Sequence, residues 1–115
     1  MIRVFICGPF RAPTMGVQYD NIARAGEAAM HAWRLGCFVL CPHLNSGSLY
    51  GLIDEAHVLA AYRQEIVRCD AVLLVQGWQE AEGALAEYEV AVRAGVPVFE
   101  DVAELERWMG ERERP

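Results

Sequence analysis

Glu87 is the side chain whose type and setting in this sequence are best suited to chemistry. It lies within residues 83–94, whose apolar spacing and closing Gly95 predict a helix. Its neighbours three and four positions away are small or aliphatic: Gly83, Ala84, Val90 and Ala91. Small neighbours leave room for a ligand beside the carboxylate, and the amino end of the helix dipole favours the ionised form. The alternative is a glutamate at the edge of the core that reaches to water.

Three loops that follow predicted strands carry further residues suited to holding a small ligand. They are Gly8-Pro9-Phe10-Arg11 after the first strand, His43-Leu44-Asn45-Ser46-Gly47 after the second and Gln76-Gly77-Trp78 after the third. In a parallel sheet, ligands bind outside the carboxyl ends of the strands, near the point where the strand order reverses. Gly8 and Arg11 can hold a phosphate or a sugar hydroxyl, or they form a plain turn with a solvated arginine. His43 can hydrogen-bond a ligand or brace its own loop.

Other kinds of site are excluded by what the sequence lacks. Gly8 is the single glycine of the first loop, so the loop is neither a dinucleotide fingerprint nor a Walker A motif. All ten basic residues are arginine, which excludes a lysine Schiff base. Cys37 and Cys41 share one face of a predicted strand but lie roughly 13 Å apart along it, too far to chelate one ion. The sequence therefore predicts neither a metal nor a cofactor.

Alternating strands and helices must position these residues. Strands are predicted over residues 2–7, 37–41, 71–75 and 96–99, and helices over 18–35, 83–94 and 102–109. Asp54 caps a further helix, whose apolar face consists of Val58, Leu59, Tyr62 and Ile66. Residues 43–51 are expected to form a loop, and Asp70 precedes its strand and so lies at the pole opposite the ligand. The order predicts an α/β fold: a three-layer, doubly wound (Rossmann- or flavodoxin-like) parallel sheet of about four strands, order 2-1-3-4, with residues 1–115 as one domain.

The composition limits the class of protein and its partners. A length of 115 residues suits one hydrophobic core. The net charge of −6 argues against a nucleic-acid polymer as partner. The apolar stretches are too short to span a membrane and no signal peptide is recognisable, so we expect a cytoplasmic protein. The hydrophobic fraction of 54% is high and favours a homodimer or a higher homo-oligomer.

Seven motifs together form a pattern that covers the chain from Val4 to about Phe99. They are Cys7-Gly8-Pro9-Phe10-Arg11, Asn21-Ile22, Pro42-His43, Cys69-Asp70-Ala71-Val72, Gly77-Trp78, Gly83-Ala84-Leu85-Ala86-Glu87 and Gly95-Val96-Pro97-Val98. This pattern resembles the small proteins related to nucleoside 2-deoxyribosyltransferases, which include 2'-deoxynucleoside 5'-monophosphate N-glycosidases.

The resemblance implies a nucleoside or nucleotide as the small-molecule partner and Glu87 as the nucleophile. Its carboxylate would attack the anomeric carbon of a deoxyribosyl group and give a covalent glycosyl-enzyme. The loop 8–11 would hold the sugar and any 5'-phosphate, while Trp78, Phe10 or Tyr50 would stack on the base. Family members often complete their sites across a dimer.

Two positions depart from the family pattern. Tyr62 stands where the family has an aspartate that helps to protonate the leaving base, and Ala81 stands in place of a serine. Either another group is the acid, with Asp54, His57 and Tyr19 as candidates, or the site binds a nucleotide-derived ligand without turnover. A structural subunit with a vestigial pocket is a third alternative. The residues predicted for catalysis are Glu87, Tyr62 and Asp54. Those predicted for substrate binding are Gly8, Pro9, Phe10, Arg11, His43, Gly77, Trp78, Gly83 and Ala84.

Overall fold

Four parallel strands form the centre of the computed structural model, which describes residues 1–112. They are β1 (Arg3–Cys7), β2 (Phe38–Leu40), β3 (Ala71–Leu74) and β4 (Val98–Phe99). Their order in the sheet is β2-β1-β3-β4, which confirms the predicted order 2-1-3-4. Val4 of β1 pairs with Val39 on one side and with Ala71 on the other. The strand order therefore reverses at β1, and Cys7 is the residue at the carboxyl end of that strand.

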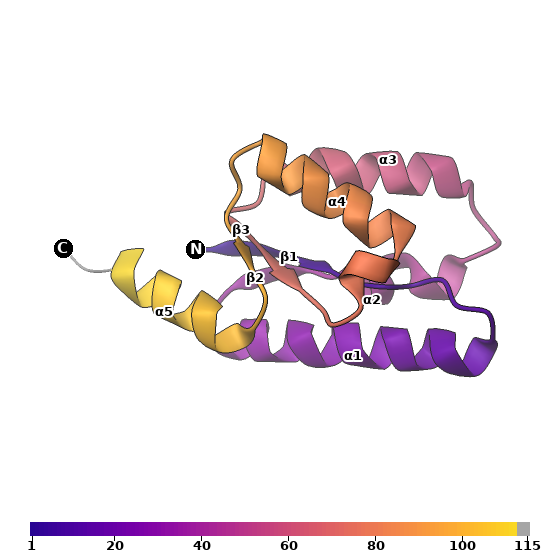
Figure 1. The fold of residues 1–115 in the computed structure, drawn as a ribbon, viewed down its shortest axis with the longest axis horizontal. Helices are drawn as coiled ribbons and strands as arrows, with labels where there is room; N and C mark the ends of the chain where they lie inside the picture. The colour runs from indigo at the N-terminus through magenta and orange to yellow at the C-terminus, as the bar shows by residue number, and fades with distance from the viewer. Residues whose placement is uncertain (113–115) are drawn as a thin grey trace.

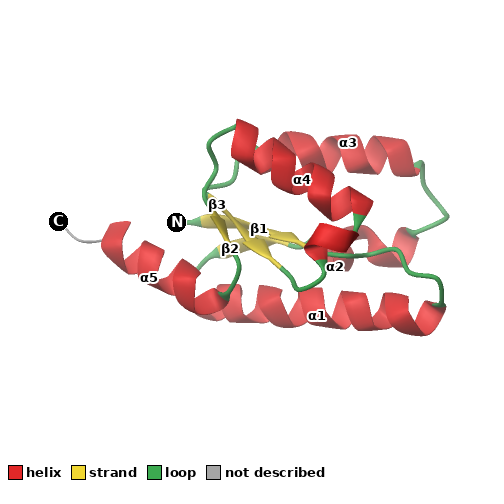
Figure 2. Ribbon diagram, viewed as in Figure 1, coloured by secondary structure: helices red, strands yellow, loops and turns green. Residues whose placement is uncertain are grey.

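Side chains of β1 alternate between two hydrophobic cores, one on each face of the sheet. Val4 and Ile6 belong to the core formed with α1 (Met15–Arg34) and α5 (Val102–Arg112). Phe5 and Cys7 belong to the core formed with α3 (Glu55–Ile66) and α4 (Glu82–Arg93). This alternation follows from the two-residue period of a strand that is covered on both faces. Figures 1 and 2 show the resulting three layers, with α3 and α4 on one side of the sheet and α1 on the other.

Polar caps fix where α1 and α3 begin. Thr14 Oγ1 accepts a hydrogen bond from the backbone N–H of Val17 at 3.2 Å, so α1 starts three residues earlier than the predicted residue 18. Asp54 Oδ1 accepts from the backbone N–H of Ala56 at 3.2 Å, which confirms Asp54 as the cap of α3. Each cap satisfies a backbone donor that has no partner inside its helix.

The prediction of a loop over residues 43–51 is wrong. The segment forms the short helix α2 (Pro42–Ser46), followed by a 3₁₀ turn at Gly47–Leu49. Pro42 occupies the first turn of α2, where a missing backbone N–H costs nothing and the fixed φ suits a helix. β2 ends at Leu40 and α2 starts at Pro42, which places His43 inside a helical turn.

Asp70 lies at the start of β3, at the end of the sheet opposite Cys7, as predicted. Its Oδ2 accepts a hydrogen bond from the backbone N–H of Arg3 at 2.8 Å. The carboxylate therefore fastens the first residue of β1 to the residue that precedes β3, and it has a structural role.

Candidate functional site

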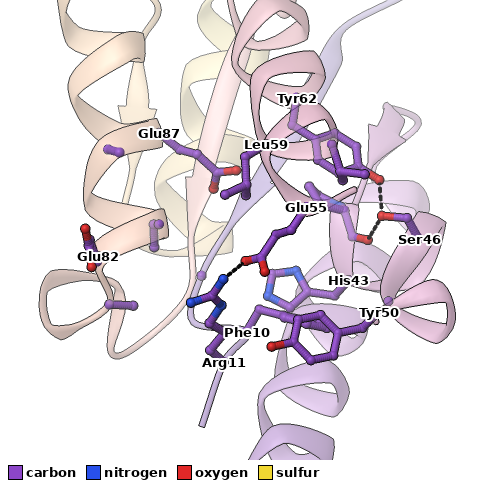
Figure 3. A pocket seen from close by; sticks show the side chains of 18 of the residues that line it. Phe10, Arg11, His43, Ser46, Tyr50, Glu55, Leu59, Tyr62, Glu82 and Glu87 are labelled. Atoms are coloured by element: carbon purple, nitrogen blue, oxygen red, sulfur yellow. Dashed lines mark hydrogen bonds and ion pairs between the residues drawn. The ribbon is translucent and has the colours of Figure 1, made fainter. Parts of the chain in front are cut away.

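A cavity of about 570 Å³ opens at the carboxyl ends of β1 and β2, between α3 and α4 (Figure 3). Its volume falls within the range of about 300–1,000 Å³ that small-molecule sites occupy. Eight of the twelve residues predicted for catalysis or substrate binding line it: Gly8, Phe10, Arg11, His43, Tyr62, Gly83, Ala84 and Glu87. They come from segments that are far apart in the chain, and the parallel topology brings them together.

Glu87 lies in the wall of this cavity and is only 8% exposed. The carboxylate does not reach to bulk water as an edge glutamate would. Burial raises its pKa from 4.5 to about 7, although the neighbouring Cys7 thiol and the charge of Arg63 act in the opposite direction. Near neutral pH the ionised and the protonated forms of Glu87 therefore coexist, whereas the sequence led us to expect the ionised form alone.

Cys7 fastens the end of β1 to the helix that carries Glu87. Its Sγ lies 3.2 Å from the backbone carbonyl oxygen of Ala84, to which the thiol donates. Burial, followed by the nearby charge of Glu87, raises the pKa of the Cys7 thiol far above its ordinary value, so the thiol stays protonated and remains a donor. The contact sets the distance between the sheet and the first turns of α4.

Gly8 follows Cys7 and has a packing reason to be glycine. A Cβ atom at this position would lie 2.6 Å from the Cβ of Val75, well inside van der Waals contact. The loop after β1 therefore passes against the end of β3 only because the side chain is absent. Gly83, on the opposite wall, has open space where a Cβ would be, so its small size leaves room in the cavity.

His43 both braces the loop after β1 and lines the cavity. A carbonyl oxygen can only accept, so the ring Nε2–H donates to the backbone oxygen of Pro9 at 2.9 Å. Burial lowers the pKa of His43, which favours the neutral ring and leaves Nδ1 as an acceptor. That Nδ1 atom is buried and has no hydrogen-bond partner among residues 1–112. The position of His43 is therefore compatible with both alternatives: the ring can brace its own loop and can hydrogen-bond a ligand.

Tyr62 lines the cavity, but its hydroxyl is engaged by α2. The oxygen lies 2.6 Å from Ser46 Oγ and accepts from Asn45 Nδ2 at 3.0 Å. Its ring meets that of Phe5 edge to face, with 6.3 Å between the ring centres. Tyr62 thus joins α2 to α3 and to the core beneath the cavity.

An ion pair and an aromatic pair lie at the mouth of the cavity. Arg11, from the loop after β1, pairs with Glu55 in the first turn of α3 (Figure 3). The rings of Phe10 and Tyr50 meet edge to face, with centres 5.4 Å apart. Sequence reasoning missed Glu55, because the preceding Asp54 accounted for the start of the helix. The signal that could have found it is its place one helical turn before Leu59, on the face predicted to turn inward.

The remaining predicted residues lie outside the lining: Pro9, Gly77, Trp78 and Asp54. Gly77 adopts a left-handed φ of 94°, which turns the chain after β3 and suits glycine. The Trp78 ring then packs on Tyr88 of α4, with centres 4.4 Å apart. Trp78 is therefore occupied as a packing residue, whereas Phe10 and Tyr50 remain beside the cavity.

Residues 1–112 contain neither a membrane-spanning helix nor a cluster of metal ligands. No helix in this part of the chain combines the length and apolar character of a membrane span. Nor do three or more His, Cys, Asp or Glu side chains gather there in a group that could hold a metal ion.

Fold and cavity together define a parallel α/β domain with a ligand-sized cavity at the carboxyl ends of its strands. The chain belongs to the family DUF4406, a domain of unknown function, which matches residues 2–100. The matched region includes the sheet and every residue of the cavity lining, and ends just before α5. No curated protein matches the chain.

Proposed function

We propose that the chain is an N-glycosidase or N-deoxyribosyltransferase that acts on a nucleoside or a nucleoside 5'-monophosphate, with Glu87 as its nucleophile. One observation carries the proposal: a buried carboxylate lies in the wall of a ligand-sized cavity, on the helix motif that resembles the deoxyribosyltransferases. The proposed partner is thus a small molecule. We propose that the protein acts in the cytoplasm.

In the proposed reaction an oxygen of ionised Glu87 attacks the anomeric carbon of the sugar. A carbon–oxygen bond forms, the carbon–nitrogen bond to the base breaks, and the electron pair and a proton go to the base. Water then attacks the same carbon, gives up a proton, and releases the Glu87 carboxylate. In a transferase cycle a second base takes the place of water.

The residues at the mouth of the cavity have the chemistry to hold such a substrate. Arg11 presents a guanidinium that suits a phosphate, and its side chain is 66% exposed. Phe10 and Tyr50 offer ring faces on which a base can stack. Ala84 and Gly83 leave space beside Glu87 for the sugar.

The test is incubation of the purified chain with deoxynucleosides and their 5'-monophosphates, with chromatographic detection of free base. We expect release by the native chain, a mass gain on Glu87 of one deoxyribosyl group (or of one deoxyribosyl 5'-phosphate with a monophosphate), and loss of both in Glu87→Gln. Glu89→Gln, two residues along α4 and exposed, is the matched control and should keep native activity. Base release that persists in Glu87→Gln would show that Glu87 is not the nucleophile.

A second candidate function is a module that binds a nucleotide-derived ligand without turnover. Two observations favour it: the Tyr62 hydroxyl is already engaged by Ser46 and Asn45, and Ala81 offers no side-chain oxygen to a ligand. Under this alternative, nucleotides raise the melting temperature of the chain although no base is released.

A further inference from the structure

The proposed reaction needs a proton for the departing base, and the acids expected from the sequence do not lie in the cavity. Asp54 caps α3, and Tyr19 and His57 are exposed; none of the three lines the cavity. Tyr62 does line it, but its hydroxyl lies 2.6 Å from Ser46 Oγ. The donor must therefore be another group that faces the same space as Glu87.

Among the glutamates that line the cavity, Glu55 is the one on the helix opposite Glu87, whereas Glu80 and Glu82 lie just before and at the start of the helix that carries Glu87. Glu55 lies in the first turn of α3 and lines the cavity together with Glu87 of α4. Figure 3 shows both side chains directed into the space between the two helices, with Leu59 between their backbones. A carboxyl pair that flanks a bound glycoside is the arrangement in which one group attacks the anomeric carbon and the other protonates the leaving group.

We propose that Glu55, which forms an ion pair with Arg11, is the proton donor to the departing base. The proposal rests on the proposed function of Glu87. The Glu55 carboxyl O–H bond breaks and its proton goes to a ring nitrogen of the base as the glycosidic bond breaks. In the second step the Glu55 carboxylate takes a proton from the attacking water, which restores the donor.

Arg11, from the loop after β1, forms an ion pair with Glu55. A phosphate on the substrate engages Arg11 more strongly than a single carboxylate does, since it carries more charge and more acceptors. Glu55 is then released from Arg11 within the cavity that it lines together with Glu87. Arg11 thus couples phosphate binding to the release of the Glu55 side chain.

The leaving group gives a direct test of this assignment. The base of 2'-deoxyguanosine 5'-monophosphate departs readily only if it receives a proton. The base of the N7-methylated nucleotide already carries a positive charge and departs without one. We expect Glu55→Gln to lower the first-turnover rate of base release from the first nucleotide by about 100-fold or more, and that from the second by less than about threefold. Glu87→Gln should abolish cleavage of both, because the nucleophile is needed in each case.

Two further variants act as controls. Glu65 lies on the same helix but outside the cavity, and it pairs with Arg68. Glu65→Gln should therefore cleave both nucleotides as the native chain does. Asp54→Asn retains a capping side chain and tests the competing acid predicted from the sequence. An equal loss on both nucleotides in Glu55→Gln would assign Glu55 to binding and overturn the proposal, with the function of Glu87 intact. So would a hundredfold loss on the first nucleotide alone in Asp54→Asn. A native chain that cleaves neither nucleotide would overturn the proposed function as well.

Discussion

At the scale of single residues, burial and the helix dipole have opposite effects on the pKa of Glu87. The dipole stabilises a negative charge by about 0.3–1 kcal/mol, mostly within the first turn of a helix. Glu87 lies beyond the first turn of α4, which begins at Glu82. Removal of a carboxylate from water costs more than the dipole returns at that distance. Desolvation therefore prevails and raises the pKa of Glu87 to about 7.

This pKa makes the stability of the fold depend on pH. The folded chain binds the Glu87 proton more tightly than the unfolded chain, whose pKa keeps the ordinary value of 4.5. The contribution of Glu87 to stability is therefore complete below pH 4.5 and is lost as the pH rises through about 7. Glu87→Gln removes the buried charge, so we expect it to be more stable than the native chain at pH 8 by roughly 3 kcal/mol or less.

Chemical denaturation at a series of pH values measures this difference. The advantage of Glu87→Gln should shrink steadily from pH 7 to pH 4.5, whereas the exposed Glu89→Gln should show no such trend. A difference between Glu87→Gln and the native chain that stays constant across the range would mean that Glu87 is not protonated in the fold.

Residues at the strand ends could be predicted from the sequence because topology alone brings them together. Arg11, His43 and Glu87 follow or face the carboxyl ends of parallel strands, and all three line the cavity. Trp78 obeys the same rule but packs on Tyr88, because the left-handed turn at Gly77 directs the chain that way. The direction of a side chain after such a turn is a tertiary property that no spacing in the sequence expresses.

At the scale of the elements, the amino end of α4 is built without a capping side chain. Ala81 adopts the extended φ and ψ of −106° and 119° that an N-cap residue requires, yet it has no oxygen to accept from the first turn. The helix dipole and free N–H groups of this end lie beside the cavity that Ala81 lines. They are available to a ligand or to an introduced side chain.

Ala81→Ser should therefore stabilise the fold by about 1 kcal/mol, because the serine oxygen accepts from an N–H of the first turn. Thermal unfolding measures the gain. The isosteric pair Ala81→Thr and Ala81→Val isolates the oxygen from the added bulk, and the threonine variant should be the more stable of the two. Equal stability of the pair would show that the first turn of α4 does not accept a cap from this position.

The boundaries of α1 and α2 show why elements are harder to predict at their ends than in their middles. Apolar spacing identified α1, but its first turn carries little periodicity and depends on the cap at Thr14. Pro42 is compatible with both the end of a strand and the start of a helix. The helix is favoured at Pro42 because α2 contacts Tyr62, a residue remote from it in the sequence.

At the scale of the whole molecule, the order of strands follows from the alternation of elements. Right-handed crossovers and two covered faces leave few arrangements for four parallel strands, and the order 2-1-3-4 is the one observed. The sequence predicted where the cavity lies, but not which side-chain contacts form its wall. Its wall depends on rotamers and on pairs such as Arg11 with Glu55, which join segments more than forty residues apart.

The surface of the molecule leads to the last prediction, a homodimer formed through the segment 44–53. Within these ten residues the exposed large apolar side chains are Leu44, Leu49, Tyr50, Leu52 and Ile53, with Leu52 77% exposed. Tyr50 and Ile53 also line the cavity, so a second copy that covers the segment would shield the mouth of the site from water.

We expect sedimentation to give about twice the chain mass of 12.8 kDa. Leu52→Glu should give the single-chain mass and a weaker response to nucleotides, whereas Val92→Glu, on the exposed side of α4, should leave the mass unchanged. A native chain that sediments as a single copy at micromolar concentration would rule out this interface, and the site would then be complete within one chain.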